Sequence, residues 1–199
     1  MTTTTDGIAL DPNAALVVID VQQGFEDSAY WGPRNNPGAE DNITALLDAW
    51  QRTGRPVVLV RHDSVHPDSP LAAGTPGNAF RDFVEKRRAD TALLVTKTVN
   101  SAFYGTPDLQ EWLTAAGIGQ LVPVGIQTNM CVETTARMAG NLGHRVLLPL
   151  DATHTFDLAG PAGLHLTADE LATATAVSLH GGGFAQVVTT AQLLAATAE

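Results

Sequence analysis

Three side chains capable of nucleophilic or acid–base chemistry stand at the ends of apolar runs in the sequence. Asp20 lies near the end of one run, Lys97 ends a second, and Cys131 follows a third. Runs of this kind, rich in β-branched residues, predict buried strands of a parallel sheet. Because ligands bind beyond the carboxyl ends of strands in an open α/β sheet, we expect the three side chains to share one rim. A carboxylate, an ammonium and a thiol gathered there could carry out nucleophilic acyl transfer.

Each of these residues also has an ordinary structural interpretation. Asp20 could cap a turn, Lys97 could be a solvated strand end, and Cys131 could serve as a small hydrophobic side chain between a helix and the sheet. Their coincidence on one rim favours the catalytic interpretation, in which Cys131 attacks a carbonyl, Asp20 takes the thiol proton and Lys97 stabilises the charge.

The segment around Cys131 carries its own helix signal. Thr128 or Asn129 is a suitable N-cap, and Val132 and Ala136 begin an apolar helical face. This pattern places Cys131 in the first turn of a helix. The macrodipole and unpaired N–H groups of that turn would favour a thiolate and could hold a developing oxyanion.

Strand-like and helix-like segments alternate along the chain. The apolar runs predict strands at 14–21, 56–62, 92–97, 120–125, 145–150 and 185–188. Helical spacing appears around 43–50, over 109–116 behind Thr106 as N-cap and Pro107 at N1, and after the capping-box pair Thr167 and Glu170. This alternation predicts βαβ units, and therefore a three-layer α/β/α fold with a mainly parallel, Rossmann-like sheet.

The length, composition and charge of the chain exclude several classes of function. With 199 residues, 44% of them apolar, the chain is expected to form a single domain over 1–199, with a flexible stretch at 1–12. A formal charge of −10 argues against binding to a nucleic acid. No run is long enough to span a membrane, and the Thr-rich start is unlike a signal peptide. The single cysteine fits a reducing cytoplasm, so a cytoplasmic location is expected.

Residues 63–90 form a long connection rich in proline and glycine in its first half. Connections of this length inside a compact domain are uncommon and often functional. Two interpretations remain open: an ordered surface excursion, which could lie at a subunit interface, and a lid over a substrate.

Three motifs together resemble the cysteine-hydrolase branch of the isochorismatase-like superfamily, which includes nicotinamidases, N-carbamoylsarcosine amidase, ureidoacrylate amidohydrolases and streptothricin hydrolase. The motifs are Asp-x-Gln-x-x-Phe from Asp20, Lys-x-x-x-Ser-Ala-Phe from Lys97, and Gly-Ile-x-Thr-Asn-x-Cys-Val-x-x-Thr-Ala over 125–136. The resemblance runs from about Leu16 to about Val188. In this order the motifs are highly specific.

The resemblance implies a six-stranded sheet of order 3-2-1-4-5-6 and a catalytic triad of Asp20, Lys97 and Cys131. It also implies a cis peptide at Ile126–Gln127, with the backbone N–H groups of Gln127 and Cys131 forming an oxyanion hole. In that order the Lys97 strand lies two strands, roughly 10 Å, from the Asp20 strand, a gap that the lysine stem or a loop must bridge. The residues expected to bind substrate are Gln22, Phe25, Trp31, Phe103 and Thr128. For Trp31, as for Tyr30 and Tyr104, a place in the core is an equal alternative.

The second strand departs from the metal-binding pattern of nicotinamidases. Their Asp-x-His pair is replaced by Arg61-His-Asp-Ser-Val-His-Pro67, in which His62, His66 and Asp63 are the nearest candidate ligands. Pro67 argues against the helix that would align the two histidines on one ion, and Asp63, adjacent to His62, would need a sharp turn. The sequence therefore predicts no metal and no cofactor.

The leading hypothesis is a metal-independent amidohydrolase that cleaves a small amide, ureide or lactam through a cysteine thioester. One alternative is a non-catalytic or regulatory member of the family that uses Cys131 as a thiol sensor. Another is an isochorismatase-type ether hydrolase, although Cys131 counts against that chemistry. A nucleotide-binding protein is disfavoured because no phosphate-binding glycine loop follows a strand. The expected partners are the substrate and further copies of the chain, in a homodimer or homotetramer.

Overall fold

The central feature of the structure, a computed structural model describing residues 8–198, is a parallel sheet of seven strands. Its path is β3-β2-β1-β4-β5-β9, and the short strand β6 pairs with the end of β4. The strands are β1 (Ala15–Ile19), β2 (Val57–His62), β3 (Leu93–Lys97), β4 (Gln120–Ile126), β5 (Arg145–Pro149), β6 (Thr153–His154) and β9 (Gln186–Val188). The order 3-2-1-4-5-6 is confirmed, with β9 as the sixth strand and β6 as an addition.

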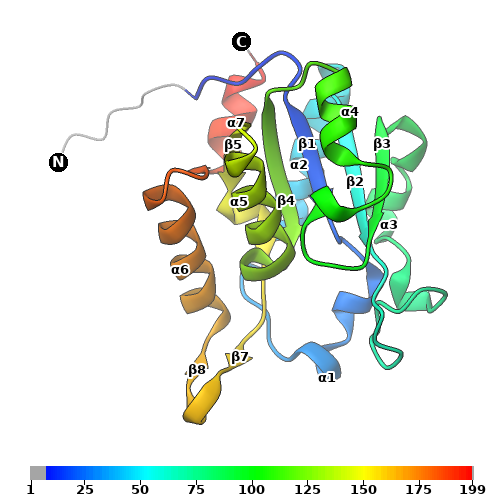
Figure 1. The fold of residues 1–199 in the computed structure, drawn as a ribbon, viewed down its shortest axis with the longest axis vertical. Coiled ribbons are helices and arrows are strands. Elements are labelled where there is room, and N and C mark those ends of the chain that lie inside the picture. Colours follow the sequence, from blue (N-terminus) through cyan, green and yellow to red (C-terminus); the bar gives the residue numbers. More distant parts are fainter. Residues whose placement is uncertain (1–7, 199) are drawn as a thin grey trace.

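Helices cover both faces of the sheet (Figure 1). The longer helices are α2 (Ala39–Arg52), α4 (Leu109–Ala115), α5 (Glu133–Asn141), α6 (Ala168–Gly181) and α7 (Thr190–Ala196). Two single-turn helices, α1 (Ser28–Trp31) and α3 (Asp82–Glu85), lie in connections, and β7 (Leu158–Ala159) pairs with β8 (His165–Leu166) in an antiparallel hairpin. The hairpin and α1 extend beyond the end of the sheet at which β1 leaves it.

Strand β1 shows why the sheet needs a layer of helices on each face. Its side chains alternate, so that Val17 and Ile19 pack into the core under α4, α5 and α6, while Leu16 and Val18 pack into the core under α2, α3 and α7. All five residues of β1 are fully buried. Burying both faces of a strand is possible only when helices cover both sides of the sheet, as the uninterrupted apolar run predicted.

Of the three helix starts predicted from capping residues, one is confirmed and two are exceptions. The capping box of Thr167 and Glu170 begins α6 as predicted. The predicted N-cap at Thr106 is wrong, because Asp108 caps α4 by accepting a hydrogen bond from the backbone N–H of Glu111. The second exception, at Cys131, is described with the site.

The connection over 63–90 is ordered and packed onto the body of the protein. It contains α3 and two short 3-10 turns, Pro76–Asn78 and Arg88–Asp90, and its side chains Leu71, Phe80 and Val84 are buried. The segment expected to be flexible, 1–12, lies outside the described residues up to position 7. Beyond that point Asp11 donates its backbone N–H to Gln120. Within 8–198, every helix is too short or too polar to cross a lipid bilayer.

Candidate active site

Asp20 lies directly after β1 and is 1% exposed. Its backbone N–H still donates to the carbonyl of Val60 in β2, at 2.9 Å, so the residue remains anchored to the sheet. Its φ of +53° is in the left-handed region, which aspartate tolerates better than most residues. The chain therefore turns sharply at Asp20 and leaves the carboxylate buried at the carboxyl edge of the sheet.

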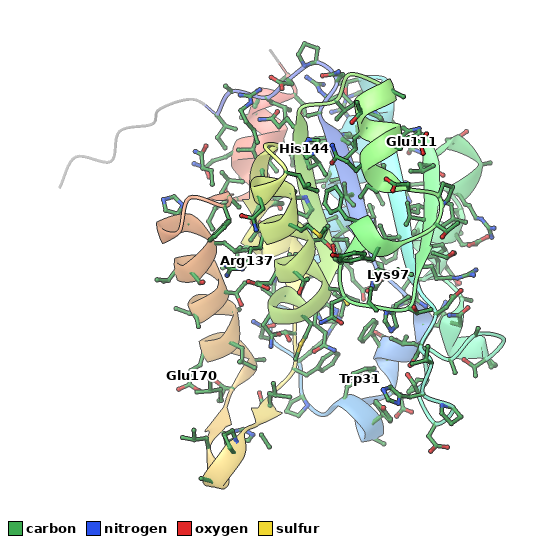
Figure 2. The ribbon with its side chains drawn as sticks, viewed as in Figure 1. Trp31, Lys97, Glu111, Arg137, His144 and Glu170 are labelled. Carbon is green, nitrogen blue, oxygen red and sulfur yellow. The ribbon has the colours of Figure 1, made fainter. Side chains whose placement is uncertain are left out.

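Lys97, the last residue of β3, reaches this carboxylate from two strands away. Its Nζ is 2.6 Å from Asp20 Oδ2, and the lysine side chain is completely buried. His62 ends the intervening strand β2 in register with Lys97, and its Nδ1 lies 3.1 Å from the same Nζ. The lysine stem thus bridges the gap expected from the strand order. Figure 2 shows Lys97 near the same end of the sheet as Trp31, whereas His144 lies toward the other end.

Cys131 approaches this pair from the turn that follows β4. The Ile126–Gln127 peptide bond is cis, as expected. A π-helical turn over Thr128–Val132 then leads into α5, and the Gln127 carbonyl accepts hydrogen bonds from the backbone N–H groups of Met130 and Val132. The predicted N-cap at Thr128 or Asn129 is therefore wrong, because no side chain caps this turn and Cys131 precedes the α-helix proper.

The three functional groups are close together. Single ligand-type atoms of Asp20, His62 and Cys131 all lie within 4.8 Å of one another. Cys131 is 8% exposed, and its Sγ lies 3.9 Å from Oδ1 of Asn100. The structure therefore brings Asp20, Lys97 and Cys131 to one buried point. His62, predicted from the sequence only as a candidate metal ligand, is a fourth member.

Burial and charge set the protonation states. Burial raises the pKa of the Cys131 thiol, and the negative charge of Asp20 raises it further, while Lys97 opposes both. Burial alone would lower the pKa of Lys97, but Asp20 and Cys131 together more than offset it, so the net shift is upward. The resting site thus holds a neutral thiol beside an ammonium. The expectation that the turn favours a thiolate is wrong, since desolvation disfavours the charged form.

The two oxygens of the Asp20 carboxylate differ in their hydrogen bonding. Oδ2 of Asp20 accepts from Lys97, whereas Oδ1 is buried and has no hydrogen-bond partner among the described residues. A buried acceptor without a partner is uncommon and calls for an explanation. A carboxylate oxygen of Asp20 lies within 4.8 Å of Cys131 Sγ, so the neutral thiol is a nearby group that could donate its proton to this carboxylate.

Gln22 and Asn78 hold the end of β2 in place. Gln22 is fully buried; its Nε2 donates to the His62 carbonyl, and its Oε1 accepts from the His62 N–H at 2.8 Å. The side chain of Asn78 donates to the same carbonyl. The amide of Gln22, expected to contact substrate, therefore contacts the backbone that carries His62. The sequence signal for the place of His62 was its position at the end of β2, the strand between those that carry Asp20 and Lys97.

The residues expected to bind substrate fall into separate environments. Phe25 and Trp31 have ring centroids 4.8 Å apart and pack with Phe156, Leu71 and Ile126 in a small apolar cluster beside the cis peptide. Phe103 packs in the main core, its ring 6.1 Å from that of His144. The Thr128 hydroxyl is buried and donates to Thr153. Phe25 and Trp31 are thus the two aromatic residues of that group nearest to the Ile126–Gln127 bond.

The donor atoms at the site do not fit a metal ion. Asp20, His62 and Cys131 could in principle supply a tetrahedral set, but the Lys97 ammonium lies within hydrogen-bond distance of both Asp20 and His62. A divalent ion there would face a buried positive charge. The other candidate ligand, Asp63, has both oxygens engaged by Arg61, and Oδ1 also accepts from Asn78.

Residues 14–192 match the isochorismatase domain, and the chain therefore belongs to the isochorismatase family. The fold agrees with a solved structure of a protein of this family from Chromobacterium violaceum. The TM-score is 0.89 at 39% identity, covering 98% of this chain and 99% of the other.

Similar proteins with curated names include both unassigned and assigned members of the family. The chain is 37% identical to the isochorismatase family protein YrdC of Bacillus subtilis, over 93% of this chain and 96% of that protein. It is 35% identical to a streptothricin hydrolase of Streptomyces noursei, over 78% of this chain and 60% of that protein. It is 33% identical to nicotinamidase 3 of Arabidopsis thaliana, over 74% and 77% of the two chains.

Proposed function

We propose that this isochorismatase-family hydrolase is an amidohydrolase that cleaves a C–N bond of a small amide, ureide or lactam without a metal. The observation that carries the proposal is the free Oδ1 of Asp20 in a buried site with a neutral Cys131 thiol. A buried base without a partner beside a protonated nucleophile is the starting arrangement for general-base activation. The likeness to a nicotinamidase and a streptothricin hydrolase supports the choice of a C–N bond.

The reaction follows from the positions of these groups. Asp20 Oδ1 takes the thiol proton as Cys131 Sγ bonds to the carbonyl carbon, and the ammonium of Lys97 offsets the negative charge that develops. The backbone N–H groups of Gln127 and Cys131 hold the oxyanion. Asp20 then returns the proton to the leaving nitrogen as the C–N bond breaks, leaving a thioester. Water, deprotonated by Asp20, hydrolyses the thioester and restores the thiol.

The protonation states bear on the alternatives. A thiol sensor needs a reactive thiolate at rest, whereas burial and Asp20 raise the pKa of Cys131. A sensor also has no use for a free carboxylate oxygen. An ether hydrolase of the isochorismatase type would not need the cysteine. The arrangement thus favours acyl transfer over both.

Ammonia release from small amides and ureides, together with ring opening of lactams followed by mass spectrometry, tests the proposal. Wild-type protein should turn over at least one class and show a thioester adduct by intact mass. Cys131→Ser should lose turnover and the adduct, with Thr134→Ser as a matched control outside the site. Full activity of Cys131→Ser would contradict the proposal.

We also infer that the chain forms a homodimer or homotetramer. The β7–β8 hairpin exposes Leu158, Leu164 and Leu166, which are 44%, 64% and 44% accessible. A two-stranded hairpin is marginally stable alone, so packing against a second copy would stabilise it. Light scattering of the purified protein tests this; a monomer at micromolar concentration would contradict it.

A further inference from the structure

The ammonium of Lys97 is buried, so the groups packed around it decide how its hydrogen bonds are satisfied. The lysine side chain is 0% exposed, and an ammonium carries three N–H donors that it cannot turn into acceptors. Leaving a buried charged donor without a partner is costly. Asp20 accepts one hydrogen bond at 2.6 Å, and the Cys131 thiol supplies a second neighbouring group. Among the described residues, Nδ1 of His62 makes a further contact, 3.1 Å from Nζ, and can accept a hydrogen bond when the imidazole is neutral.

We infer that His62 is a positioning residue for the reaction: its neutral imidazole accepts a hydrogen bond from Lys97 and so directs the ammonium toward Asp20 and Cys131. The inference rests on the proposed function, since it names a role for His62 at the same site. His62 does not need to touch the substrate for this role. It acts through Lys97, whose orientation decides whether the developing thiolate is stabilised.

The surroundings of His62 are built to hold this geometry. Gln22 hydrogen-bonds to both its backbone N–H and its carbonyl, and Asn78 donates to the same carbonyl. The next residue, Asp63, donates its N–H to the Lys97 carbonyl at 2.8 Å. The imidazole is therefore held at a fixed position beside Lys97 by rigid strand ends.

Charged groups face His62 from three strand ends, and its role as an acceptor requires the neutral form. They are Lys97 from β3, Asp20 after β1, and Asp63 after β2, with the thiol of Cys131 beyond Asp20. Burial lowers the pKa of His62, Lys97 lowers it further, and the two carboxylates oppose this, so that the net shift is downward from 6.5. Protonation at acidic pH would turn Nδ1 into a donor and place a second cation beside Lys97.

Three substitutions separate an acceptor at Nδ1 from mere space filling. In His62→Asn, the amide oxygen occupies nearly the position of Nδ1, whereas in His62→Gln it reaches the position of Nε2. His62→Leu fills similar space without an acceptor. His66→Leu, at an exposed histidine of the following loop, is the matched control.

The readouts are the rate at which iodoacetamide alkylates Cys131, the only cysteine of the chain, and kcat on a substrate from the amide panel. We expect His62→Asn to stay within about 3-fold of wild type at pH 8, and His62→Gln and His62→Leu to lose about 10-fold or more, as for a lost hydrogen bond to a charged group. Below pH 6.5 the wild-type alkylation rate should fall more steeply than that of His62→Asn, which lacks the titrating group.

Equal rates for the Asn, Gln and Leu variants would overturn the inference, as would coincident pH profiles for wild type and His62→Asn. Circular dichroism checks folding, and the Asn–Gln comparison remains valid if the Leu variant fails to fold. Alkylation needs no substrate. The absence of turnover on every amide would therefore contradict the proposed function alone, whereas equal alkylation rates would contradict the role of His62.

Discussion

At the scale of single residues, the site depends on the different uses of the two oxygens of Asp20. One is held by Lys97 and the other is free and buried. In the proposed reaction, these two roles would allow a carboxylate in an ion pair to act as a base. The ion pair fixes the group, while the second oxygen remains available to the thiol.

Asp20→Asn tests this division of roles. The substitution nearly preserves volume but removes the base, so we expect turnover to fall at least 100-fold, within the range for loss of a general base. Asp68→Asn, at an exposed position, is the control. Normal turnover together with a normal rate of iodoacetamide labelling at Cys131 would show that Asp20 is not the base.

Lys97→Met tests the role of the ammonium. Methionine keeps most of the stem and removes the charge that lowers the pKa of Cys131. We therefore expect the pKa of the thiol to rise further and acylation to slow. The measurement is the alkylation rate of Cys131 against pH, whose rise should move to higher pH. An unchanged titration would leave Lys97 with a structural role only.

Chelation tests the prediction that no metal takes part. Because the Lys97 ammonium lies between Asp20 and His62, we expect EDTA to leave activity unchanged. Activity should be assayed before and after dialysis against EDTA, with metal content measured in parallel. Stoichiometric zinc or iron, with activity lost on chelation and restored by the metal, would contradict the prediction.

At the scale of secondary-structure elements, the site is made by strand ends whose relative positions are fixed by backbone hydrogen bonds. Asp20 bonds to Val60, His62 is in register with Lys97, and Gln22 connects β1's exit to the end of β2. The ends of β1, β2 and β3 are therefore fixed relative to one another. The connection over 63–90 contributes Asn78 to this rim, which gives that segment a structural use.

Gln22→Met distinguishes this role from direct substrate binding. The substitution removes buried hydrogen bonds to the His62 N–H, the His62 carbonyl and the Asn78 carbonyl. We expect the free energy of unfolding to fall by about 3 kcal/mol. Urea unfolding followed by circular dichroism measures it, with Gln51→Met on α2 as a control. Unchanged stability with a raised KM would instead support direct contact with substrate.

At the scale of the whole molecule, the stability of the fold should depend on pH through His154. This histidine is 1% exposed, at the end of β6, and its Nε2 lies 3.1 Å from Arg34. Burial lowers its pKa to about 3, and the positive charges of Arg34 and Arg81 contribute. The folded protein thus holds the neutral form at pH values where the unfolded chain is protonated.

The sign of the effect follows from proton uptake. Between pH 6.5 and about 3 the unfolded state binds a proton that the folded state does not, so the free energy of unfolding falls as pH decreases through this window. The loss attributable to His154 is at most about 5 kcal/mol. Urea midpoints at pH 7 and pH 4 measure it. His154→Gln should show a smaller difference than wild type or His66→Gln, and equal differences would contradict the assignment.

The sequence by itself determined the fold class and pointed to Asp20, Lys97 and Cys131 as the candidate triad, and the resemblance carried by its motifs implied the order of the main strands. Buried parallel strands require continuous apolar runs, and the chemistry of Asp20, Lys97 and Cys131 requires those side chains at the ends of such runs. Both requirements are local, so they can be read from neighbouring residues. The motifs linked them to a known family, and residues 14–192 match that family.

Only the tertiary structure decided how these residues work together. The reach of Lys97 across β2, the free oxygen of Asp20 and the raised pKa of Cys131 depend on distances between segments up to 111 positions apart in the chain, from Asp20 to Cys131. His62 lies beside Lys97, and Gln22 hydrogen-bonds to the backbone of His62, because backbone hydrogen bonds align the neighbouring strands. Desolvation likewise arises only when remote segments exclude water, which is why a helix signal at Cys131 predicted the opposite shift of its pKa.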